Sequence, residues 1–299
     1  MISGFVLAKK GEKISKSKNN AKSSPTQLLD KYGADMIRYW TASNKLGTDT
    51  WFDEKDIESS KRFLNKLWNS SRFAQMHLID YEPTENINLL PIDRWIVSKC
   101  SLTFSKYTKQ MENYEMGLAR LEVDNFFWKD FCDNYLEIVK ERLYNEDNKY
   151  TLEERKSAQM ALYTVLKEVL KMYSPFVPHI TEFIYQELYK SHEKDKILST
   201  SKFENLSIDN KCVEFGEVIK DVISEVRKYK TLNGYSMKQP IGCLKIYTTL
   251  DNIRLIRESL SDIQACTHAQ MIDFDLSNET KVEITSLVND LDIPLSLKK

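Results

Sequence analysis

Lysine and serine side chains alternate near the start of this chain, in the run Lys13-Ile14-Ser15-Lys16-Ser17. The run lies within residues 9–24, a segment rich in lysine, serine and asparagine that we expect to form a loop. Lysine ammonium groups on a mobile loop can close on a polyphosphate as its negative charge rises, and open again to release it. The candidate phosphate contacts are Lys13, Ser15, Lys16 and Ser17.

The charge of the chain is unevenly distributed along its length. The formal net charge is −1, which does not by itself indicate a nucleic-acid partner. Residues 1–31, however, contain seven lysines against only Glu12 and Asp30. The phosphate-binding candidate therefore lies in a strongly basic segment, and the remainder of the chain is acidic overall.

The cysteines and the apolar residues exclude several classes of protein. The five cysteines, at positions 100, 132, 212, 243 and 266, lie far apart with no CxxC pair, so we expect neither a zinc site nor a disulfide framework. Free, scattered cysteines are typical of a reducing cytoplasm. No apolar run approaches 18 residues, so we expect no membrane span.

Helical patterns dominate the rest of the sequence. Residues 1–8 fit one buried strand, and Pro25 suits the first turn of a helix running to about residue 40. Apolar residues then recur at helical spacing, and the pair Thr151 and Glu154 has the spacing of a capping box. We expect helices at about 53–72, 95–114, 116–144, 151–173, 181–189 and 213–230, and short strands near residues 244–247, 266, 271–274 and 282–284, with a helix at 252–260 between them.

These patterns predict a mainly α protein with several parts. We expect residues 1–50 to form the end of a preceding domain, with the strand, the basic loop and a following helix. Residues 51–190 form a helical bundle, residues 191–210 a polar linker, and residues 211–299 a helix with a small α+β unit.

The basic loop and its continuation resemble a known family. KISKS at residues 13–17 resembles the KMSKS signature loop of class I aminoacyl-tRNA synthetases, and residues 24–38, SPTQLLDKYGADMIR, look like the family's following helix. Ile14 and Asn19 depart from the usual Met and Gly, and both changes should be tolerated. The resemblance implies that Lys16 is the main ATP contact, that Lys13 assists it, and that Ser15 and Ser17 offer hydroxyls or amides to the phosphates.

Four further segments are similar to valyl-tRNA synthetases. They are residues 65–73 (NKLWNSSRF), 91–95 (PIDRW), 128–137 (WKDFCDNYLE) and 174–182 (SPFVPHITE). Asn134 departs from a position that is often Trp. The FCD run distinguishes this group from the isoleucyl enzymes, which share the loop and the DRW segment. The similarity is clear over residues 1–190 and loose over residues 211–299.

The resemblance implies a function that this chain would share with missing parts. The family joins valine to its tRNA through valyl-adenylate, using ATP with magnesium and, in this portion, no zinc. The first strand would close a Rossmann-type catalytic domain, and the helical bundle would bind the anticodon. The valine pocket and the HIGH motif would lie upstream, since no HxGH tetrad occurs here. We therefore expect a cytoplasmic, monomeric tRNA-binding portion that does not activate valine by itself.

Contacts to RNA are harder to assign from sequence. Anticodon bases are splayed single-stranded nucleotides, read by stacking and by hydrogen bonds to their edges. The candidates on the first bundle helix, facing the RNA stem, are Arg62, Lys66, Asn69 and Arg72. The candidates at the end of the third helix, beside a loop at residues 145–150, are Lys140, Arg142 and Tyr144. Each could equally be ordinary solvated surface. We expect Trp68, Trp95, Phe127, Phe131, Cys132 and Tyr135 in the core, and a packing role for His179.

Three alternatives remain open at this point. The chain could be a stand-alone tRNA-binding module with a vestigial loop, or a fragment of an isoleucyl or leucyl enzyme. It could also be a helical scaffold that binds no RNA. A gene that continues upstream of Met1 in the same frame would exclude the stand-alone module. Anticodon preference separates an isoleucyl or leucyl fragment from a valyl enzyme, and salt-dependent tRNA binding excludes the scaffold.

Overall fold

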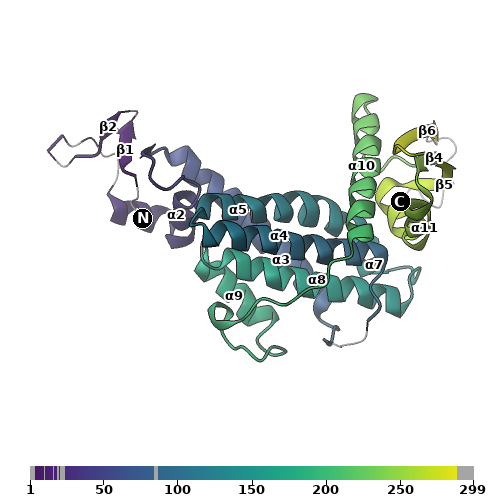
Figure 1. Cartoon of the computed structure of the whole chain (residues 1–299), viewed down its shortest axis with the longest axis horizontal. Helices are drawn as coiled ribbons and strands as arrows, with labels where there is room; N and C mark the ends of the chain where they lie inside the picture. The colour runs from purple at the N-terminus through teal and green to yellow at the C-terminus, as the bar shows by residue number, and fades with distance from the viewer. Residues whose placement is uncertain are drawn as a thin grey trace. The chain divides into compact units, whose positions relative to one another are not determined.

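The computed structural model describes residues 4–9, 11–15, 17–18, 20, 24–83 and 87–287 (Figure 1). The chain divides into two compact units. Unit 1 comprises residues 1–83, 100–128 and 162–206, and unit 2 comprises residues 84–99, 129–161 and 207–299. The boundaries expected at residues 50, 190 and 210 stay predictions. Most described residues are helical, as the sequence predicts.

Unit 1 begins with a small sheet that carries the basic loop. Its strands are β1 (Val6–Lys9), β2 (Glu12–Lys13) and β3 (Thr50–Trp51), in the order β2-β1-β3. β1 pairs with β2 antiparallel and with β3 parallel. The expected strand is therefore present, but most of its described side chains are not buried, and Thr50–Trp51 contribute one further short strand. In β1, Leu7 is buried while Val6 is exposed.

The helix expected from Pro25 to residue 40 is two helices. α1 (Pro25–Tyr32) begins with a capping box between Ser24 and Gln27, and α2 (Ala34–Thr41) follows after one residue. Gly33 separates them, with φ at +77°. Glycine adopts this backbone conformation readily, and it is incompatible with a continuing α-helix. The prediction of one helix was wrong because helical spacing continues across the break.

The bundle helices follow the expected order. They are α3 (Glu54–Leu78), α4 (Pro91–Glu112), α5 (Met116–Asn125), the π-helical segment η1 (Phe126–Tyr135), α6 (Leu136–Ile138), α7 (Lys140–Tyr144), α8 (Leu152–Tyr173) and α9 (Pro178–Leu188). The capping box of Thr151 and Glu154 is confirmed at the start of α8. Within unit 1, α3 packs against α2 and α9.

The helix expected over residues 116–144 is not regular. Its middle part, η1, is π-helical, a form in which backbone N–H groups bond five residues back instead of four. The Asn134 side chain follows the same spacing, since its Nδ2 donates to the Lys129 carbonyl at 2.6 Å. The wider turn shifts the side chains that follow it, which a 3.6-residue pattern does not predict.

Unit 2 ends in a helix and a small α+β unit, as expected. It contains α10 (Asn210–Leu232), β4 (Ile241–Thr248), α11 (Leu250–Glu258), α12 (Leu260–Thr267), β5 (Ala269–Leu276) and β6 (Lys281–Leu287). The sheet order is β5-β4-β6, with β5 parallel and β6 antiparallel to β4. The strand expected at Cys266 was wrong, because Cys266 lies in α12, where Ile263 and Thr267 are buried at helical spacing.

A close approach of a helix to an aromatic ring positions α10. Trp95 on α4 is fully buried, which confirms its expected core position. A Cβ atom at Gly216 of α10 would lie 2.0 Å from the Trp95 ring. Only glycine lets the α10 backbone pack this closely on the indole.

Neither a metal site nor a membrane helix is found in the described part of the chain. No group of three or more His, Cys, Asp or Glu side chains there is arranged to hold a metal ion. None of the helices there combines the length and the apolar character needed to span a bilayer. All five cysteines are free thiols.

Candidate functional site

The basic loop is a hairpin extension whose shape depends on one asparagine. Leu7 lies opposite Lys13 and Lys9 opposite Glu12 in the β1–β2 pair. Asn20 accepts a hydrogen bond from the Ser15 amide at 2.8 Å and donates to the Lys13 carbonyl at 3.0 Å. It also donates to the Glu12 carboxylate at 3.0 Å. One side chain thus ties the return of the loop to its start.

Several described side chains of the loop contact one another or a nearby ring. The Lys13 ammonium lies 4.0 Å from the centroid of the Phe5 ring, a cation–π contact on an exposed surface. The Ser15 and Ser17 hydroxyls are 2.8 Å apart. Because one hydroxyl of such a pair donates to the other, the second keeps its proton for an outside acceptor. Lys16 lies outside the described residues, so its predicted role stays a prediction.

The segment after the loop is joined to a second sequence motif. Asp35 of the KYGAD segment accepts hydrogen bonds from the backbone amides of His179 and Ile180, at 3.3 and 2.8 Å, at the start of α9. It also lies 2.9 Å from the His179 Nδ1. Arg38 donates to the Pro175 carbonyl at 2.7 Å. These hydrogen bonds therefore fasten α2, the second helix after the loop, to the SPFVPHITE segment.

His179 does not have the packing role that we expected. Its side chain is 72% exposed and pairs with Asp35. The expectation was wrong because His179 follows Pro178 at the first turn of α9, where backbone amides lack helical partners. The Asp35 carboxylate of α2 accepts hydrogen bonds from these amides, and the His179 imidazole beside it remains exposed to solvent.

The four candidates on α3 lie along one side of the helix. Arg62, Asn69 and Arg72 are exposed, whereas Lys66 is half-buried with its ammonium 5.5 Å from the Trp128 ring centroid. Arg62 lines a groove of about 450 Å³ that is also lined by Tyr39, Ser43, Ser59, Phe63, Arg120 and Trp128. Arg62 is the exposed arginine of this groove, because Arg120 is paired with Asp124 and only 13% exposed. An exposed cation beside aromatic rings is a combination suited to a nucleotide.

Trp68 is not in the core as we expected. It is 40% exposed and lies beside Phe183 of α9, with ring centroids 5.8 Å apart. The buried side of α3 is set instead by Ile57, Phe63, Leu67 and Ala74. Arg72 completes a small pocket next to the two rings. Apolar spacing grouped Trp68 with its neighbour Leu67, but only Leu67 lies on the buried side of the helix.

The three candidates near α7 have different environments. Lys140 is exposed, 3.8 Å from Glu137, and Tyr144 is 46% exposed. Arg142 is fully buried, with its Nη1 2.8 Å from Asp93 and its Nη2 3.2 Å from Asp262. Burial alone would lower the pKa of the guanidinium, but the two carboxylates raise it. The expectation that Arg142 contacts RNA was wrong, because both ends of its guanidinium are taken up inside the protein.

The buried arginine belongs to a cluster that joins two sequence motifs. Asp93 of the PIDRW segment accepts from the Tyr135 hydroxyl at 2.8 Å and from Arg142, and the Ser157 hydroxyl also donates to it. Tyr135 belongs to the WKDFCDNYLE segment and is fully buried, as are Phe127 and Phe131. Cys132 is also buried. These positions confirm the expected core, and they show that Asp93 has a structural role.

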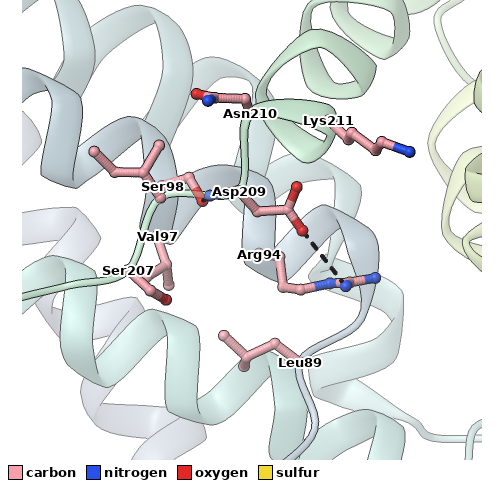
Figure 2. Close-up of a pocket in the computed structure, with 9 residues that line it drawn as sticks. Leu89, Arg94, Val97, Ser98, Ser207, Asp209, Asn210 and Lys211 are labelled. Carbon is pink, nitrogen blue, oxygen red and sulfur yellow. Dashed lines mark hydrogen bonds and ion pairs between the residues drawn. The ribbon is translucent and has the colours of Figure 1, made fainter.

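A polar pocket of about 440 Å³ lies at the start of α10 (Figure 2). Arg94 and Asp209 face each other across it, with Nη1 and Oδ2 3.5 Å apart. Asp209 also accepts from the Cys212 amide at 3.1 Å, so it caps the helix. Because the protein's own carboxylate occupies the helix terminus, the pocket offers little to an outside anion.

Comparisons with known proteins agree with these motifs. A family described as the anticodon-binding domain of tRNA ligase matches residues 93–248, and class I tRNA synthetases (I, L, M and V) match residues 1–53. A valine–tRNA ligase of Rickettsia canadensis (strain McKiel) is 39% identical over 297 residues, covering 95% of this chain and 35% of that protein. One from Pyrococcus abyssi (strain GE5 / Orsay) is 37% identical over 268 residues, covering 87% of this chain and 30% of that protein.

The chain thus spans about a third of the length of these relatives. A solved ternary complex of Agrobacterium radiobacter K84 agnB2 LeuRS, tRNA and LeuAMS has a TM-score of 0.51 and 18% identity, covering 71% of this chain and 24% of that one. At this identity the likeness concerns the fold alone. The anticodon-binding family matches just over half of the sequence. The chain therefore belongs to the anticodon-binding domain family of tRNA ligases, joined to the end of a class I synthetase domain and similar to valine–tRNA ligases.

Proposed function

We propose that this chain is the tRNA-binding portion of a valine–tRNA ligase, which joins valine to its tRNA through valyl-adenylate. The observation that carries the proposal is the 39% identity to a valine–tRNA ligase across 95% of the chain. The ligase acts in the cytoplasm as a monomer, which suits the free cysteines. Valine binds to the part of the enzyme that precedes these residues.

The basic loop serves the activation of valine in this proposal. Lys13 and Lys16 neutralise the pyrophosphate that ATP releases, and the Ser15 and Ser17 hydroxyls bind its oxygens. The contact of Lys13 with the Phe5 ring is weak enough to exchange for a phosphate. Magnesium, when bound with ATP, would offset part of the phosphate charge. The role of this chain is to bind and orient the phosphates.

The exposed side of α3 is the first RNA surface in this proposal. Arg62 and Arg72 bind phosphates, while Lys66 and Asn69 contact the backbone or base edges between them. Three of these residues border aromatic rings on which an unstacked base can lie: Arg62 and Lys66 lie near Trp128, and Arg72 lies near Trp68.

The end of α7 is the second RNA surface. Tyr144 lines a pocket that also contains Glu141, Glu146 and Asp147. These carboxylates repel phosphate, so we assign Tyr144 to stacking on a base and Lys140 to a nearby phosphate. Arg142 has no part in this surface.

The test is a titration of valine tRNA at two salt concentrations, beside a transcript with a changed central anticodon base. We expect binding that weakens steeply with salt, by a slope of about −0.7 to −0.9 per phosphate contact, and that weakens further with the base change. Binding indifferent to the base would favour a general tRNA module, and absent binding would contradict the proposal. These 299 residues alone should catalyse no ATP–pyrophosphate exchange, because the sequence contains no HxGH tetrad.

A further inference from the structure

The charge on α10 changes sign along the helix. Its earlier turns carry the acidic residues Glu214, Glu217, Asp221 and Glu225. From Arg227 onward the chain contains four cationic residues and no acidic residue as far as Pro240. We call residues 227–240, the last turns of α10 and the loop to β4, the α10 tip. Its composition is basic in a chain whose net charge is −1.

The loop of the α10 tip is folded back onto its helix by a buried lysine. The Lys230 ammonium donates to the Met237 carbonyl at 2.9 Å and to the Thr267 carbonyl at 3.0 Å. The Tyr235 amide donates to the Lys230 carbonyl at 2.8 Å. Burial lowers the pKa of Lys230 to about 8. Because these hydrogen bonds hold the loop, it has a defined shape before any ligand binds, which limits the entropy lost on binding.

Aromatic and apolar side chains accompany the cations on the surface of the α10 tip. The rings of Tyr229 and Tyr235 are nearly parallel, with centroids 6.4 Å apart and planes at 23°. Leu232 is 77% exposed, and Tyr235 and Met237 are also exposed. Cations interleaved with exposed aromatic rings are typical of surfaces that bind the RNA backbone and stack its bases.

The charged groups around the α10 tip do not neutralise its positive charge. Lys228 pairs loosely with Glu225 at 3.4 Å, with both side chains more than half exposed. Arg227 donates to the Asp133 backbone carbonyl at 3.3 Å. Burial, and then the charges of Lys230 and Lys238, lower the pKa of the neighbouring His268, while Glu141 opposes the shift. The positive charges of Lys230 and Lys238 are therefore not fully neutralised at the position of His268.

A simpler reading is that these lysines only stabilise the end of a helix. Cations do favour the last turn, where the helix dipole is negative. That explanation covers Lys228 and Lys230 but not Lys238, which lies in the loop beyond the helix end at Leu232. It also gives no reason for the exposed Tyr235 ring, which lies beside the half-buried Tyr229.

We propose that the α10 tip is a further RNA-binding surface, at which Lys228 and Lys238 bind tRNA phosphates and Tyr235 stacks on a ribose or base. The inference rests on the proposed tRNA-binding function and adds a contact surface to it. Lys230 acts as a positioning residue that holds the loop.

The test compares two double variants of the full 299-residue chain in valine tRNA titrations over a range of salt. Lys228→Ala/Lys238→Ala should lower the steepness of the salt dependence by about 1.5, as expected for two lost phosphate contacts. Lys156→Ala/Lys281→Ala, which removes two other exposed lysines of unit 2, should leave it unchanged. Equal slopes for all three proteins, when the wild type binds and responds to the central anticodon base, overturn this inference alone. A wild type that binds no tRNA overturns the proposed function with it.

A third variant separates stacking from charge. Tyr235→Ala should weaken binding about tenfold with an unchanged salt slope, and Tyr235→Phe should bind as the wild type does. Unchanged affinity of Tyr235→Ala contradicts the stacking role. All substituted side chains are exposed, and thermal melts verify that each variant is folded.

Discussion

Each compact unit contains an aspartate that binds a tyrosine hydroxyl and an arginine inside the protein, but the charges are balanced differently. In unit 1, Asp124 accepts from the hydroxyls of Tyr39 at 2.9 Å and Tyr173 at 2.8 Å, and pairs with Arg120 at 2.5 Å. In unit 2, Arg142 lies between two carboxylates, those of Asp93 and Asp262.

The difference lies in the net charge that each unit must bury. Asp124 and Arg120 form one neutral pair, and each side chain keeps 13% of its surface exposed. The cluster in unit 2 has one carboxylate in excess and almost no exposed surface. Burial raises the pKa of Asp262 to about 7, with the charge of Asp93 adding to the shift and that of Arg142 opposing it. The first cluster is a stable ion pair, whereas the second holds a proton near neutral pH.

The largest effect is expected from removing the buried arginine. Arg142→Ala leaves two carboxylates without a cation in the interior and should lower the free energy of unfolding by about 3–5 kcal/mol. Arg120→Ala is the matched variant, and it should cost about 1–2 kcal/mol, because Asp124 keeps both tyrosine hydroxyls. Urea unfolding monitored by circular dichroism measures both losses. Equal losses would contradict the difference between the clusters.

The second prediction concerns pH. The pKa of Asp262 is about 7 in the folded chain against an ordinary value of 3.8, so the folded state binds the proton more tightly. The stability that this proton provides is complete below about pH 4 and is lost as pH rises through 7. The loss should be on the order of 2–4 kcal/mol.

Asp262→Asn cannot ionise, and it should remove this part of the pH dependence of unfolding. Asp251→Asn, at an exposed aspartate of the same unit, should retain it. A pH profile of Asp262→Asn parallel to that of the wild type would show that the cluster holds no proton.

The third prediction compares one helical glycine from each unit. Gly216→Ala places a Cβ atom 2.0 Å from the buried Trp95 ring and should cost about 1–3 kcal/mol through overpacking. Gly117→Ala in α5 places a Cβ atom at ordinary contact distances, 3.4 and 3.5 Å, from the Ala42 and Asn44 carbonyl oxygens, and should be neutral or slightly stabilising through helix propensity. Thermal unfolding distinguishes the two. A neutral Gly216→Ala would mean that α10 is free to move away from Trp95.

The smallest effects are expected at two helix caps. Asp35 of unit 1 caps α9 from a distant part of the chain, where it accepts hydrogen bonds from the His179 and Ile180 amides. Asp209 of unit 2 directly precedes α10 and accepts a hydrogen bond from the Cys212 amide. Asp35→Ala should cost about 1–2 kcal/mol and Asp209→Ala about 1 kcal/mol. Hydrogen exchange at the first turns of α9 and α10 locates each loss. Protection lost at α10 but kept at α9 would reverse the expected order.

Local regularities in the sequence account for most of the elements. Apolar spacing predicted α4, α8 and α10, and the capping box at Thr151 located the start of α8. Spacing also predicted that Trp95, Phe127 and Tyr135 lie in the core. These predictions succeed because the same short-range backbone bonds and buried stripes form in almost any globular context.

The predictions failed where apolar spacing determines neither the backbone conformation nor the burial of a side chain. Gly33 breaks a helix that periodicity continues, and the π-helical turns of η1 shift a pattern that assumes 3.6 residues per turn. Trp68 and His179 were misplaced because their exposure depends on which distant helix covers them.

By itself, the sequence determined the motifs, the order of the helices and the family, because these depend on residue type and local spacing. Only the tertiary structure decided which charged residues remain available to a ligand. Arg142 resembles an exposed helix-end cation until Asp93 and Asp262, from separate parts of the chain, neutralise it. Lys238 resembles ordinary solvated charge until Lys230 holds its loop beside two tyrosines. An ion pair between distant residues leaves no local pattern, since folding alone brings its partners together.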